Sequence, residues 1–515
     1  MFLAYRRWTA AFLGTVAIAA CSYGTVKVRS LETPTATDAT SVATPVKAHL
    51  SDGITVLFPQ GVALADGELL GAGQRVGLRL ESLGDVSRLP LDSVLGMETY
   101  EREVSAGATA ALSSLAVLTG AVATAALAVA IFGSCPTFYA DSAGTWALEA
   151  EGFSYSIAAL YESRDVDRLR TTLRADGTVQ LEVRNEALET HFINQLELLD
   201  VHHATGETVL PDADGRPVAV GPKQPALRAW AGTGQDLRAI LAAADGQVTR
   251  EELDGQELDP GGLDRRIDLE LPVPPGADSM AVVLRLRNSL LNTVLLYDVM
   301  LGSRGLRSLE WQSTTLRQIG PALEVAQWYS GNMGLTLLEL TAEGTREVAH
   351  LRDTGPIAFK DVAFVIAAPR SPTVRLRLEY VIDNWRIDQL SAAPVRRPEM
   401  DVLPLAAALD PAGASNDTVR ELLASADGHY LQTSPGQRFT AVWQPKPLSP
   451  GLSRTFLLAS QGYYSEWMRQ AWISQPRDTT AFVPDRTTIA TAVKLWRGAR
   501  DSLEREFFNS RLPVR

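Results

Sequence analysis

A six-residue stretch that occurs twice decides the fold of this chain. Thr178-Val179-Gln180-Leu181-Glu182-Val183 matches Thr373-Val374-Arg375-Leu376-Arg377-Leu378, 195 residues further on. In both stretches apolar residues alternate with polar ones, and a period of two is typical of a β-strand with one buried face. The sequence therefore predicts the same half-buried strand at two places.

Four more pairs of segments repeat on either side of this strand, and the distance between partners falls from 200 to 175 residues without any change of order. They are Gly144-Thr145 with Gly344-Thr345, Ile193-Asn194-Gln195-Leu196 with Ile387-Asp388-Gln389-Leu390, the helical segment 237–246 with 419–428, and Pro275-Gly276 with Pro450-Gly451. This spacing is too long for a solenoid repeat. It predicts two copies of one domain: copy A, residues 135–301, and copy B, residues 335–475.

The fold class that follows is mainly β. Many short strands with turn residues between them predict a β-sandwich-like domain for each copy. Residues 46–103 show the same alternation and predict a small N-terminal β-barrel or sheet. A helical insertion is expected at 302–334, with Leu316, Ile319, Leu323 and Ala326 on one face, and a C-terminal helix within 476–515.

The first residues predict that the protein is exported. Residues 1–20 contain Arg6 and Arg7, an uncharged core and small residues before Cys21, which is the pattern of a secretory signal. Ile18-Ala19-Ala20-Cys21 resembles the lipobox of bacterial lipoproteins, which implies cleavage before Cys21 and a lipid on its sulfur. Ser22 in the next position would favour the outer membrane, and residues 21–45 would form a tether. The alternative is an uncleaved signal anchor.

Residues 104–134 predict one hydrophobic helix. Ala106–Gly133 is 28 residues long and has no charge, so as a helix it would extend about 42 Å. That length is sufficient to span a membrane with some tilt. A helix buried in protein, or a hairpin of two half-helices turning at Gly120, fits as well, and the many small residues would permit self-association into a homo-oligomer.

Charge and cysteine content exclude several classes of function. The 515 residues carry a net charge of −12, which disfavours a nucleic-acid partner. Only two cysteines occur, and if Cys21 is acylated no disulfide can form. Cys135 has no basic neighbour in the sequence to lower its pKa, so we interpret it as a small buried residue.

No metal or cofactor site is predicted. His202 and His203 are adjacent and would point to opposite faces of a strand, and His191 has Arg386 near its equivalent position in copy B. The segment from Asp245 to Glu252 is similar to half of an EF-hand, but its earlier ligand positions hold Leu241 and Ala243, which supply no side-chain oxygen. The motifs of zinc proteases, serine hydrolases and phosphate-binding loops do not occur.

Two groups of residues are candidates for binding. Tyr463, Tyr464 and Trp467 would form an aromatic surface for a glycan or a protein, with a role in the core as the alternative. Asn194 and Asp388 occupy the same position in the two copies, which indicates either a shared binding role or hydrogen bonds that brace the strands.

Two resemblances extend over residues 135–470. Cys135-Pro136-Thr137-Phe138-Tyr139, followed by Leu148-Glu149-Ala150-Glu151, resembles a Cys-Pro-x-x-Tyr…Leu-Glu-Gly-Glu pattern of exported bacterial proteins without an assigned activity. The segments Asn288–Gly302, Trp385–Gln389 and Arg454–Trp467 are similar to the region that accompanies ASPIC/UnbV-type secreted repeat proteins. This chain lacks the calcium-binding propeller repeats of that group. The resemblance therefore implies an exported, β-rich envelope protein and no particular ligand.

These observations together predict a lipid-anchored protein of the cell envelope, attached through Cys21 and exposed to the periplasm or the cell surface. We expect a non-enzymatic binding or scaffolding module whose partners are membrane lipid, through Cys21 and Ala106–Gly133, and an envelope protein or glycan. One alternative is a polysaccharide-active enzyme with a site built from loops, in which two carboxylates would lie about 5–9.5 Å apart. Another is an oligomer formed through the hydrophobic helix.

Overall fold

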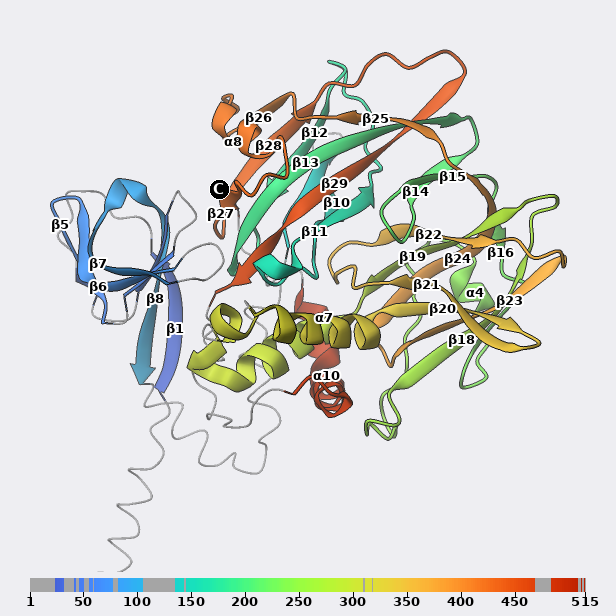
Figure 1. Ribbon diagram of the computed structural model, residues 1–515, viewed down its shortest axis with the longest axis horizontal. Helices are drawn as coiled ribbons and strands as arrows, with labels where there is room; N and C mark the ends of the chain where they lie inside the picture. The colour runs from blue at the N-terminus through green and yellow to red at the C-terminus, as the bar shows by residue number, and fades with distance from the viewer. Residues whose placement is uncertain are drawn as a thin grey trace, which may run out of the picture. The chain divides into compact units, whose positions relative to one another are not determined.

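The computed structural model describes residues 24–31, 41–42, 46–50, 55–58, 60–76, 82–104, 135–142, 145–308, 311–316, 318–467, 483–507, 511 and 514 (Figure 1). Cys21 and Ala106–Gly133 lie outside these residues. The chain divides into two compact units: residues 1–129 with 302–309 and 468–479, and residues 130–301 with 310–467 and 480–515. We call them the N-terminal unit and the sandwich unit. Among the described helices, none combines the length and the apolar character needed to cross a membrane.

The N-terminal unit is an antiparallel sheet in the order β1-β8-β3-β4-β6-β5-β2, with β7 paired to β6. Alternate side chains of its strands, among them Val46, Ala48 and Phe58, form a separate hydrophobic core. The elements are β1 (Gly24–Leu31), β2 (Ser41–Val42), β3 (Val46–Leu50), β4 (Thr55–Phe58), β5 (Val62–Ala65), β6 (Glu68–Val76), β7 (Ser82–Pro90), the 3₁₀ turn η1 (Leu91–Ser93) and β8 (Val94–Val104).

Part of the range expected to be a tether belongs to this sheet. Strand β1 pairs with β8 from Gly24↔Val104 to Leu31↔Met97. The alternating Val26 and Val28 within β1 are the strand signal that the tether interpretation of residues 21–45 overlooked.

The sandwich unit contains two β-sandwiches. In sandwich I the sheet β10-β9-β12-β28-β26 packs against the sheet β11-β29-β13-β25, with β27 also paired to β13. Its elements are β9 (Thr137–Ser142), β10 (Thr145–Glu151), η2 (Ala159–Tyr161), β11 (Ser163–Arg168), β12 (Val179–Arg184), β13 (Glu189–Ala204), β25 (Glu399–Leu403), β26 (Ala407–Leu409), α8 (Asp417–Leu422), β27 (Leu431–Thr433), β28 (Arg438–Trp443) and β29 (Leu452–Glu466).

Sandwich II has the same plan. The sheet β21-β20-β23-β18-β17 packs against a sheet that contains β22-β19-β24, with β15 and β16 paired to β24. Its elements are β14 (Thr208–Pro211), β15 (Pro217–Val220), β16 (Gln224–Pro225), β17 (Arg228–Ala231), α4 (Arg238–Leu241), β18 (Asp264–Pro272), β19 (Ser279–Asn288), β20 (Leu335–Thr341), β21 (Gly344–Leu351), β22 (Lys360–Ala367), β23 (Thr373–Val381) and β24 (Trp385–Arg396). The predicted fold class, mainly β with duplicated sandwiches and a C-terminal helix, is confirmed.

Each sandwich combines the first half of one sequence copy with the second half of the other. Strand β12 of copy A pairs with β28 of copy B, and β23 of copy B pairs with β18 of copy A. In Figure 1 the orange-red β28 and β29 accordingly lie beside the blue-green to green β12 and β13. The two predicted copies therefore exchange halves instead of folding separately.

Asn194 and Asp388 each form hydrogen bonds that connect one sequence copy to the other. The Asn194 Oδ1 atom accepts hydrogen bonds from the backbone N–H groups of Asp427 (3.2 Å) and Gly428 (3.3 Å). The Asp388 Oδ1 atom accepts the same pair from Asp245 (3.2 Å) and Gly246 (2.9 Å). Both side chains brace the Asp-Gly turn of the opposite copy, so the structural interpretation of this recurring position is confirmed.

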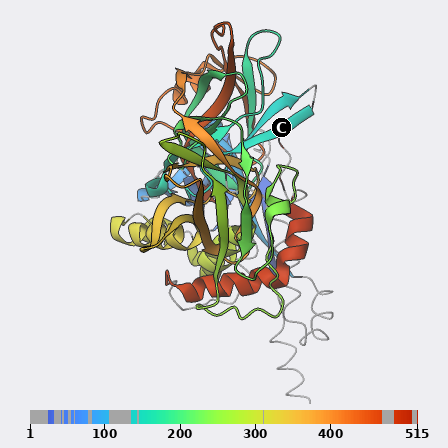
Figure 2. The same ribbon diagram turned by 90° about the vertical axis from the view of Figure 1, so that its right-hand side faces the viewer.

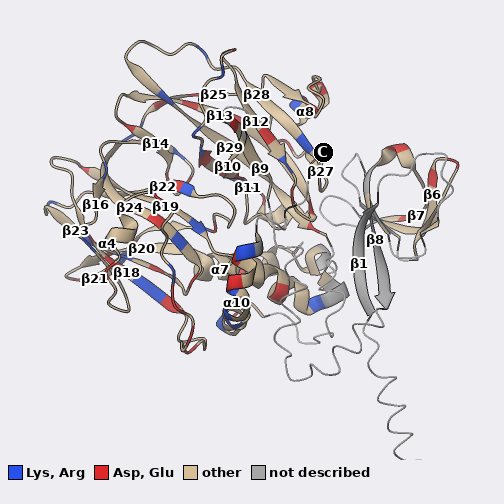
Figure 3. Cartoon of the chain, turned by 180° about the vertical axis from the view of Figure 1, so that it is seen from behind, with Lys and Arg blue, Asp and Glu red and all other residues tan. Residues whose placement is uncertain are grey.

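A buried cation connects the two sandwiches. Lys360 Nζ, at the start of β22, lies 2.6 Å from Asp165 Oδ1 and 2.8 Å from Asp167 Oδ1, both on β11. Nearby, Arg285 binds Asp361 at 3.1 Å. Elsewhere in the unit, charged residues of both signs are interspersed along the strands (Figure 3).

The helices that follow the sandwich strands lie in the connection between the copies and at the C-terminus. They are α5 (Leu291–Val294), the π-helix η3 (Leu295–Leu301), the 3₁₀ segment η4 (Gly302–Arg307), the π-helical turn η5 (Trp311–Thr315), α7 (Ile319–Met333) and α10 (Arg486–Glu506). Helix α10, red in Figure 2, buries Trp496, whose Nε1–H donates to Asp383 Oδ2 at 2.8 Å. The predicted C-terminal helix is thus a packing element of the sandwich unit.

Candidate ligand-binding cavity

A cavity of about 610 Å³ lies within the sandwich unit, a size typical of small-molecule sites. Two loops at equivalent places in the copies contribute to it: the loop between β10 and β11, and the loop between β21 and β22. The segment α5–η3, helix α7 and the end of β29 complete the wall. The lining residues are Ser154, Tyr155, Ile157, Leu160, Tyr161, Asn292, Thr293, Leu296, Tyr297, Met300, Leu323, Val325, Ala326, Gln327, Tyr329, Ser330, Gly331, His350, Arg352, Asp353, Gly355, Pro356 and Tyr464.

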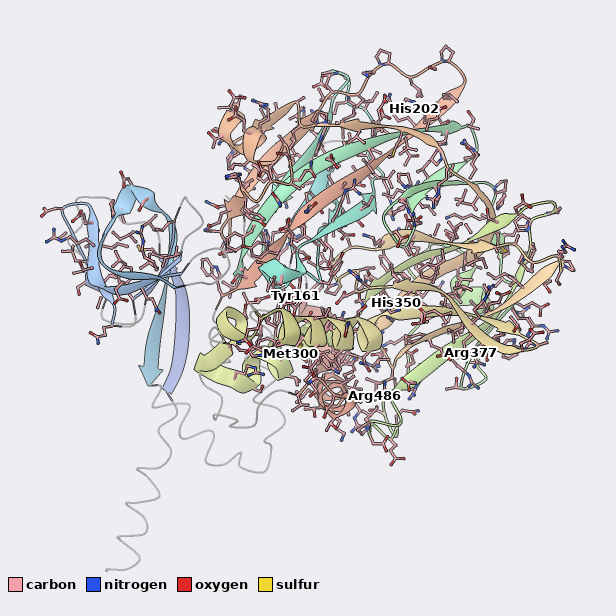
Figure 4. The ribbon with its side chains drawn as sticks, in the orientation of Figure 1. Tyr161, His202, Met300, His350, Arg377 and Arg486 are labelled. Carbon is pink, nitrogen blue, oxygen red and sulfur yellow. The ribbon has the colours of Figure 1, made fainter. Side chains whose placement is uncertain are left out.

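Helix α7 brings residues from the connection between the copies to the cavity. Figure 4 shows Tyr161 near one end of this helix and His350 near the other, with Met300 on the neighbouring η3. The Tyr161 hydroxyl donates to the Ala322 carbonyl at 2.9 Å and so holds the helix against the β10–β11 loop.

Segment α5–η3 supplies one wall. The chain is α-helical over Leu291–Val294 and continues as a π-helix over Leu295–Leu301. π-helical turns are rare and are frequent at functional sites. Here Leu296, Tyr297 and Met300 from the π-helical part line the cavity.

Tyrosine is the most frequent residue in the lining, with Tyr155, Tyr161, Tyr297, Tyr329 and Tyr464. The Tyr464 hydroxyl donates to the Ser154 carbonyl at 2.9 Å, and the Tyr329 hydroxyl donates to Asp353 Oδ2 at 2.7 Å. These hydroxyls, and that of Tyr161, donate their protons to protein groups, so these protons are not available to a ligand.

Asp353 is the only carboxylate among the lining residues that the structure describes. Its Oδ2 atom accepts hydrogen bonds from Tyr329 and from the Asn292 amide, and its Oδ1 atom accepts one from the Gly355 N–H at 2.8 Å. Burial raises the pKa of Asp353, and the three hydrogen bonds act in the opposite direction. Within the described part of the chain, no lysine or arginine forms an ion pair with it.

Two buried polar atoms of the cavity wall have no hydrogen-bond partner among the described residues. They are the Oδ1 atom of Asn292 and the Oγ atom of Ser154, on side chains that are about 95% buried. Buried polar atoms normally have a hydrogen-bond partner. Two such atoms without a protein partner in a cavity wall therefore indicate an exchangeable partner such as water or a ligand.

Glu151 fixes the loop that forms the floor of the cavity. Its Oε2 atom accepts hydrogen bonds from the backbone N–H groups of Ile357 (2.5 Å) and Ala358 (2.7 Å), and its Oε1 atom accepts one from Cys135 Sγ at 3.2 Å. Burial, reinforced by the nearby Asp353, raises the pKa of Glu151 to about 8 despite these hydrogen bonds. The Cys135…Glu151 segments quoted in the sequence analysis are therefore a structural brace behind the cavity.

Gly355 lies directly against this brace. Its φ angle is +82°, and a Cβ atom at this position would lie 1.4 Å from Glu151 Oε1. Any side chain here would displace Glu151 from the loop, so the close approach requires glycine.

Ser330 and His350 form the second polar contact of the wall. The His350 Nε2 atom lies 3.2 Å from Ser330 Oγ, and its Nδ1 atom lies 3.1 Å from Thr336 Oγ1. Burial lowers the pKa of His350, which favours the neutral ring. A threonine takes the place at which a catalytic triad has a carboxylate, so this contact lacks the group that would stabilise a charged imidazole.

The apolar face predicted for the helical insertion is not buried as a whole. Leu323 lines the cavity and is 53% exposed, and Ile319, one turn earlier, is 76% exposed. The residues of α7 that pack inward are Ala322, Val325 and Met333. Leu160, half-exposed, also belongs to the lining, so apolar side chains border the cavity where it meets solvent.

The aromatic residues proposed as an exposed surface are interior residues. Tyr463, Tyr464 and Trp467 are each at most 2% exposed, because β29 is an inner strand between β11 and β13. Tyr463 stacks on Phe192, and Trp467 Nε1 donates to Thr190 Oγ1 at 2.8 Å. Of the three, Tyr464 alone reaches the cavity wall.

The remaining sequence candidates lie outside the cavity. Cys135 is a buried residue whose Sγ donates to Glu151, which agrees with the core position expected for it. His202 lies 3.5 Å from Asp200, and His203 Nε2 lies 2.9 Å from Thr455 Oγ1. The described residues contain no cluster of three or more His, Cys, Asp or Glu side chains arranged to hold a metal ion.

Sequence reasoning did not identify Asp353, Tyr329 or Asn292. They come from three segments that are far apart in the chain and show no common periodicity. The signal that could have found the loop was Asp353-Thr354-Gly355-Pro356, a turn sequence at the place where copy A has the β10–β11 loop.

No protein-family model and no curated protein matches this chain. Among solved structures, it is similar to the GH31 α-xylosidase from Xanthomonas citri (9% identity, TM-score 0.18, 85% of this chain and 36% of that one). It is also similar to tripeptidyl peptidase 2 (9%, TM-score 0.14, 93% and 30%) and to a structure of the infectious bursal disease virus Gx strain (10%, TM-score 0.13, 93% and 87%). The chain thus spans about a third of the first two structures, and similarity at this level identifies no shared function.

Proposed function

We propose that this protein is a binding module of the cell envelope that holds a small amphipathic molecule in the cavity of its sandwich unit. The observation that carries the proposal is the cavity itself, about 610 Å³, with apolar and aromatic side chains and several polar groups in its wall. Pockets of this size and character are the usual sites of small-molecule binding.

The distribution of polar groups supports an amphipathic ligand. Leu296, Met300 and Leu323 offer apolar contact, whereas Asp353, Asn292 and Ser154 offer polar atoms beside the Glu151-anchored loop. A molecule with an apolar body and one polar end would satisfy both regions.

A polysaccharide-active enzyme is less well supported by this cavity. Both classes of glycoside hydrolysis normally require a pair of carboxyl groups on the two sides of the scissile bond. Asp353 is one such group, but Glu151 is fully buried behind the loop and binds two backbone N–H groups and Cys135. The described lining residues offer no second carboxylate.

The binding proposal can be tested by filling the cavity. We would titrate the full chain, in phosphatidylcholine nanodiscs, with the neutral probe 4-phenylbutan-1-ol and measure heats by isothermal titration calorimetry against empty nanodiscs. Saturable binding with a Kd at or below about 1 mM is expected for the unchanged protein.

Two tryptophan variants in the same helix supply the comparison. Ala326 lines the cavity, so Ala326→Trp would occupy it and weaken binding at least tenfold. Glu324 is exposed and does not line the cavity, so Glu324→Trp should bind like the unchanged protein. Heats equal to those of empty nanodiscs for the unchanged protein, or equal binding by both variants, would contradict the proposal.

We propose in addition that Cys21 carries a lipid that attaches the protein to the outer membrane, on the basis of Ile18-Ala19-Ala20-Cys21. Labelled palmitate should be incorporated into the unchanged protein and into Cys135→Ala, but not into Cys21→Ala. Labelling of Cys21→Ala at the level of the unchanged protein would refute the anchor.

A further inference from the structure

We infer that the ligand of this cavity is a protonated primary or secondary amine with an apolar body, bound with its ammonium group beside Asp353 and its body among the tyrosine rings. This inference rests on the proposed function and names the ligand class of the same cavity.

The charge of Asp353 has no balancing partner among the described side chains. Asp353 is 9% exposed and has hydrogen bonds from Tyr329, Asn292 and Gly355, but no ion pair with a described cation. A buried carboxylate without a positive partner is costly, and burial accordingly raises its pKa. An ammonium ligand would supply the missing charge, whereas a carboxylate or phosphate ligand would add repulsion.

Only one cationic side chain lines the cavity in the described part of the chain. Arg352 is exposed, and its guanidinium carbon lies 5.8 Å from the centre of the Tyr155 ring. It therefore contacts a tyrosine face at the edge of the site, and burial lowers the pKa of His350, which disfavours its charged form. Neither group neutralises Asp353 in the interior.

The wall of the cavity is rich in tyrosine. Tyrosine rings carry negative charge on their faces and attract cations within about 6 Å of the ring centre. The hydroxyls of Tyr161, Tyr329 and Tyr464 are held by hydrogen bonds, which fixes the rings in place. Five tyrosines line the cavity that holds this carboxylate, and such a wall is more suitable for an organic cation than for an anion.

Two oxygen atoms of the cavity wall have no hydrogen-bond partner among the described residues. Asn292 Oδ1 and Ser154 Oγ are buried, line the cavity and can accept hydrogen bonds. Asn292 donates its amide N–H to Asp353, which leaves the Oδ1 atom as an acceptor. Primary and secondary ammonium groups have N–H donors for these acceptors, whereas a quaternary ammonium has none.

The size of the cavity and its wall define the rest of the ligand. Ile157, Leu296, Met300 and Val325 are apolar lining residues, and Leu323 and Leu160 continue this surface towards solvent. An alkyl or arylalkyl chain attached to the amine would remove this apolar area from water.

Three probes that share one phenylbutyl body test the inference. They are 4-phenylbutylamine, 4-phenylbutan-1-ol and 4-phenylbutyrate, titrated at pH 7.5 into the full chain in phosphatidylcholine nanodiscs, with empty nanodiscs as the blank. We expect the amine to bind at least tenfold more tightly than the alcohol, and the carboxylate to bind most weakly. N,N,N-trimethyl-4-phenylbutylammonium should bind less tightly than the primary amine, because it cannot donate hydrogen bonds.

Asp353→Asn provides the matched variant, since it keeps the size of the side chain and removes its charge. The amine should lose at least tenfold in affinity, and the alcohol should change less than threefold. If this variant does not fold, the order of the probes on the unchanged protein still decides the question.

The outcomes separate this inference from the proposed function. Equal binding of amine and alcohol, or tightest binding of the carboxylate, would overturn the amine inference and leave the binding cavity supported. Binding of none of the probes would overturn both.

Discussion

Sandwich I and sandwich II have the same strand plan, but equivalent positions hold different side chains. Asn194 and Asp388 both bind the Asp-Gly turn of the other copy through Oδ1. The remaining atom of Asn194 donates to Glu162 at 2.6 Å, whereas that of Asp388 accepts from Arg285 at 3.0 Å. The hydrogen bonds to the backbone are common to both sandwiches, and the charges around them are not.

Equivalent positions also hold different side chains where the two sandwiches meet. The hairpins β9–β10 and β20–β21 have a register shift at the same place. Beyond this shift, Glu151 of β10 lies opposite Thr137 of β9, and His350 of β21 lies opposite Thr336 of β20. Glu151 braces the floor of the cavity from behind, and His350 lines the cavity and contacts Ser330 of α7. The two loops are equivalent in the copies, and their different side chains have different roles at the cavity.

The largest effect is expected from Lys360→Met. This change removes the buried cation between Asp165 and Asp167 and leaves two carboxylates facing each other, at a cost of about 3–5 kcal/mol at pH 7. Chemical denaturation should show this loss of unfolding free energy. Arg346→Met, which removes an exposed pair with Glu339 in the same sandwich, is the control and should cost less than about 1 kcal/mol.

The next largest effect is expected from replacing Gly355 with alanine, compared with the same change at Gly276 or Gly451. Gly355→Ala would place a Cβ on Glu151 and should destabilise the protein by about 3 kcal/mol or more. Gly276 and Gly451 are equivalent in the two copies, with φ angles of +72° and +82°, and a Cβ atom at either position would meet open space. Alanine at either should cost only about 1–2 kcal/mol, and a cost at Gly355 no larger than this would contradict the role of the brace.

Glu151 should make stability depend on pH. Its pKa is about 8 in the folded protein and near 4.5 when unfolded, so the folded state binds more protons between these values. Stability should therefore fall as pH rises from 5 to 8, on the order of 3 kcal/mol across that window. Denaturation of Glu151→Gln at the same pH values should show a flatter profile, and an unchanged slope would assign the effect to other groups.

The smallest effect distinguishes the two braces. Asn194→Ala should cost about 1–2 kcal/mol through the loss of its hydrogen bonds. Asp388→Ala should cost about 1 kcal/mol more, because it also removes a partner of Arg285. Equal losses in urea denaturation would mean that the charge difference between the sandwiches has no energetic consequence.

The sequence predicted the strands and their duplication because alternation such as Val179, Leu181 and Val183 is a local signal. It could not predict the exchange of halves, since β18 and β28 carry equivalent patterns and either could complete the sheet beside β12. It left Tyr463 and Trp467 open between a binding surface and the core, and their burial follows from the position of β29 between two other strands. The cavity depends on Asp353, Asn292 and Tyr329, which only the tertiary fold brings together.

Disulfide cross-linking tests the exchange of halves most directly. Gln180 on β12 lies opposite Val442 of copy B, whereas Glu270 is the equivalent of Val442 in copy A and lies opposite Arg375. In a Cys21→Ala, Cys135→Ser background, oxidation of the monomer should join Gln180→Cys to Val442→Cys and leave Gln180→Cys with Glu270→Cys unjoined, as read by mass spectrometry of the linked peptides. A disulfide between positions 180 and 270, without one between 180 and 442, would show that each copy folds on itself and would contradict the account.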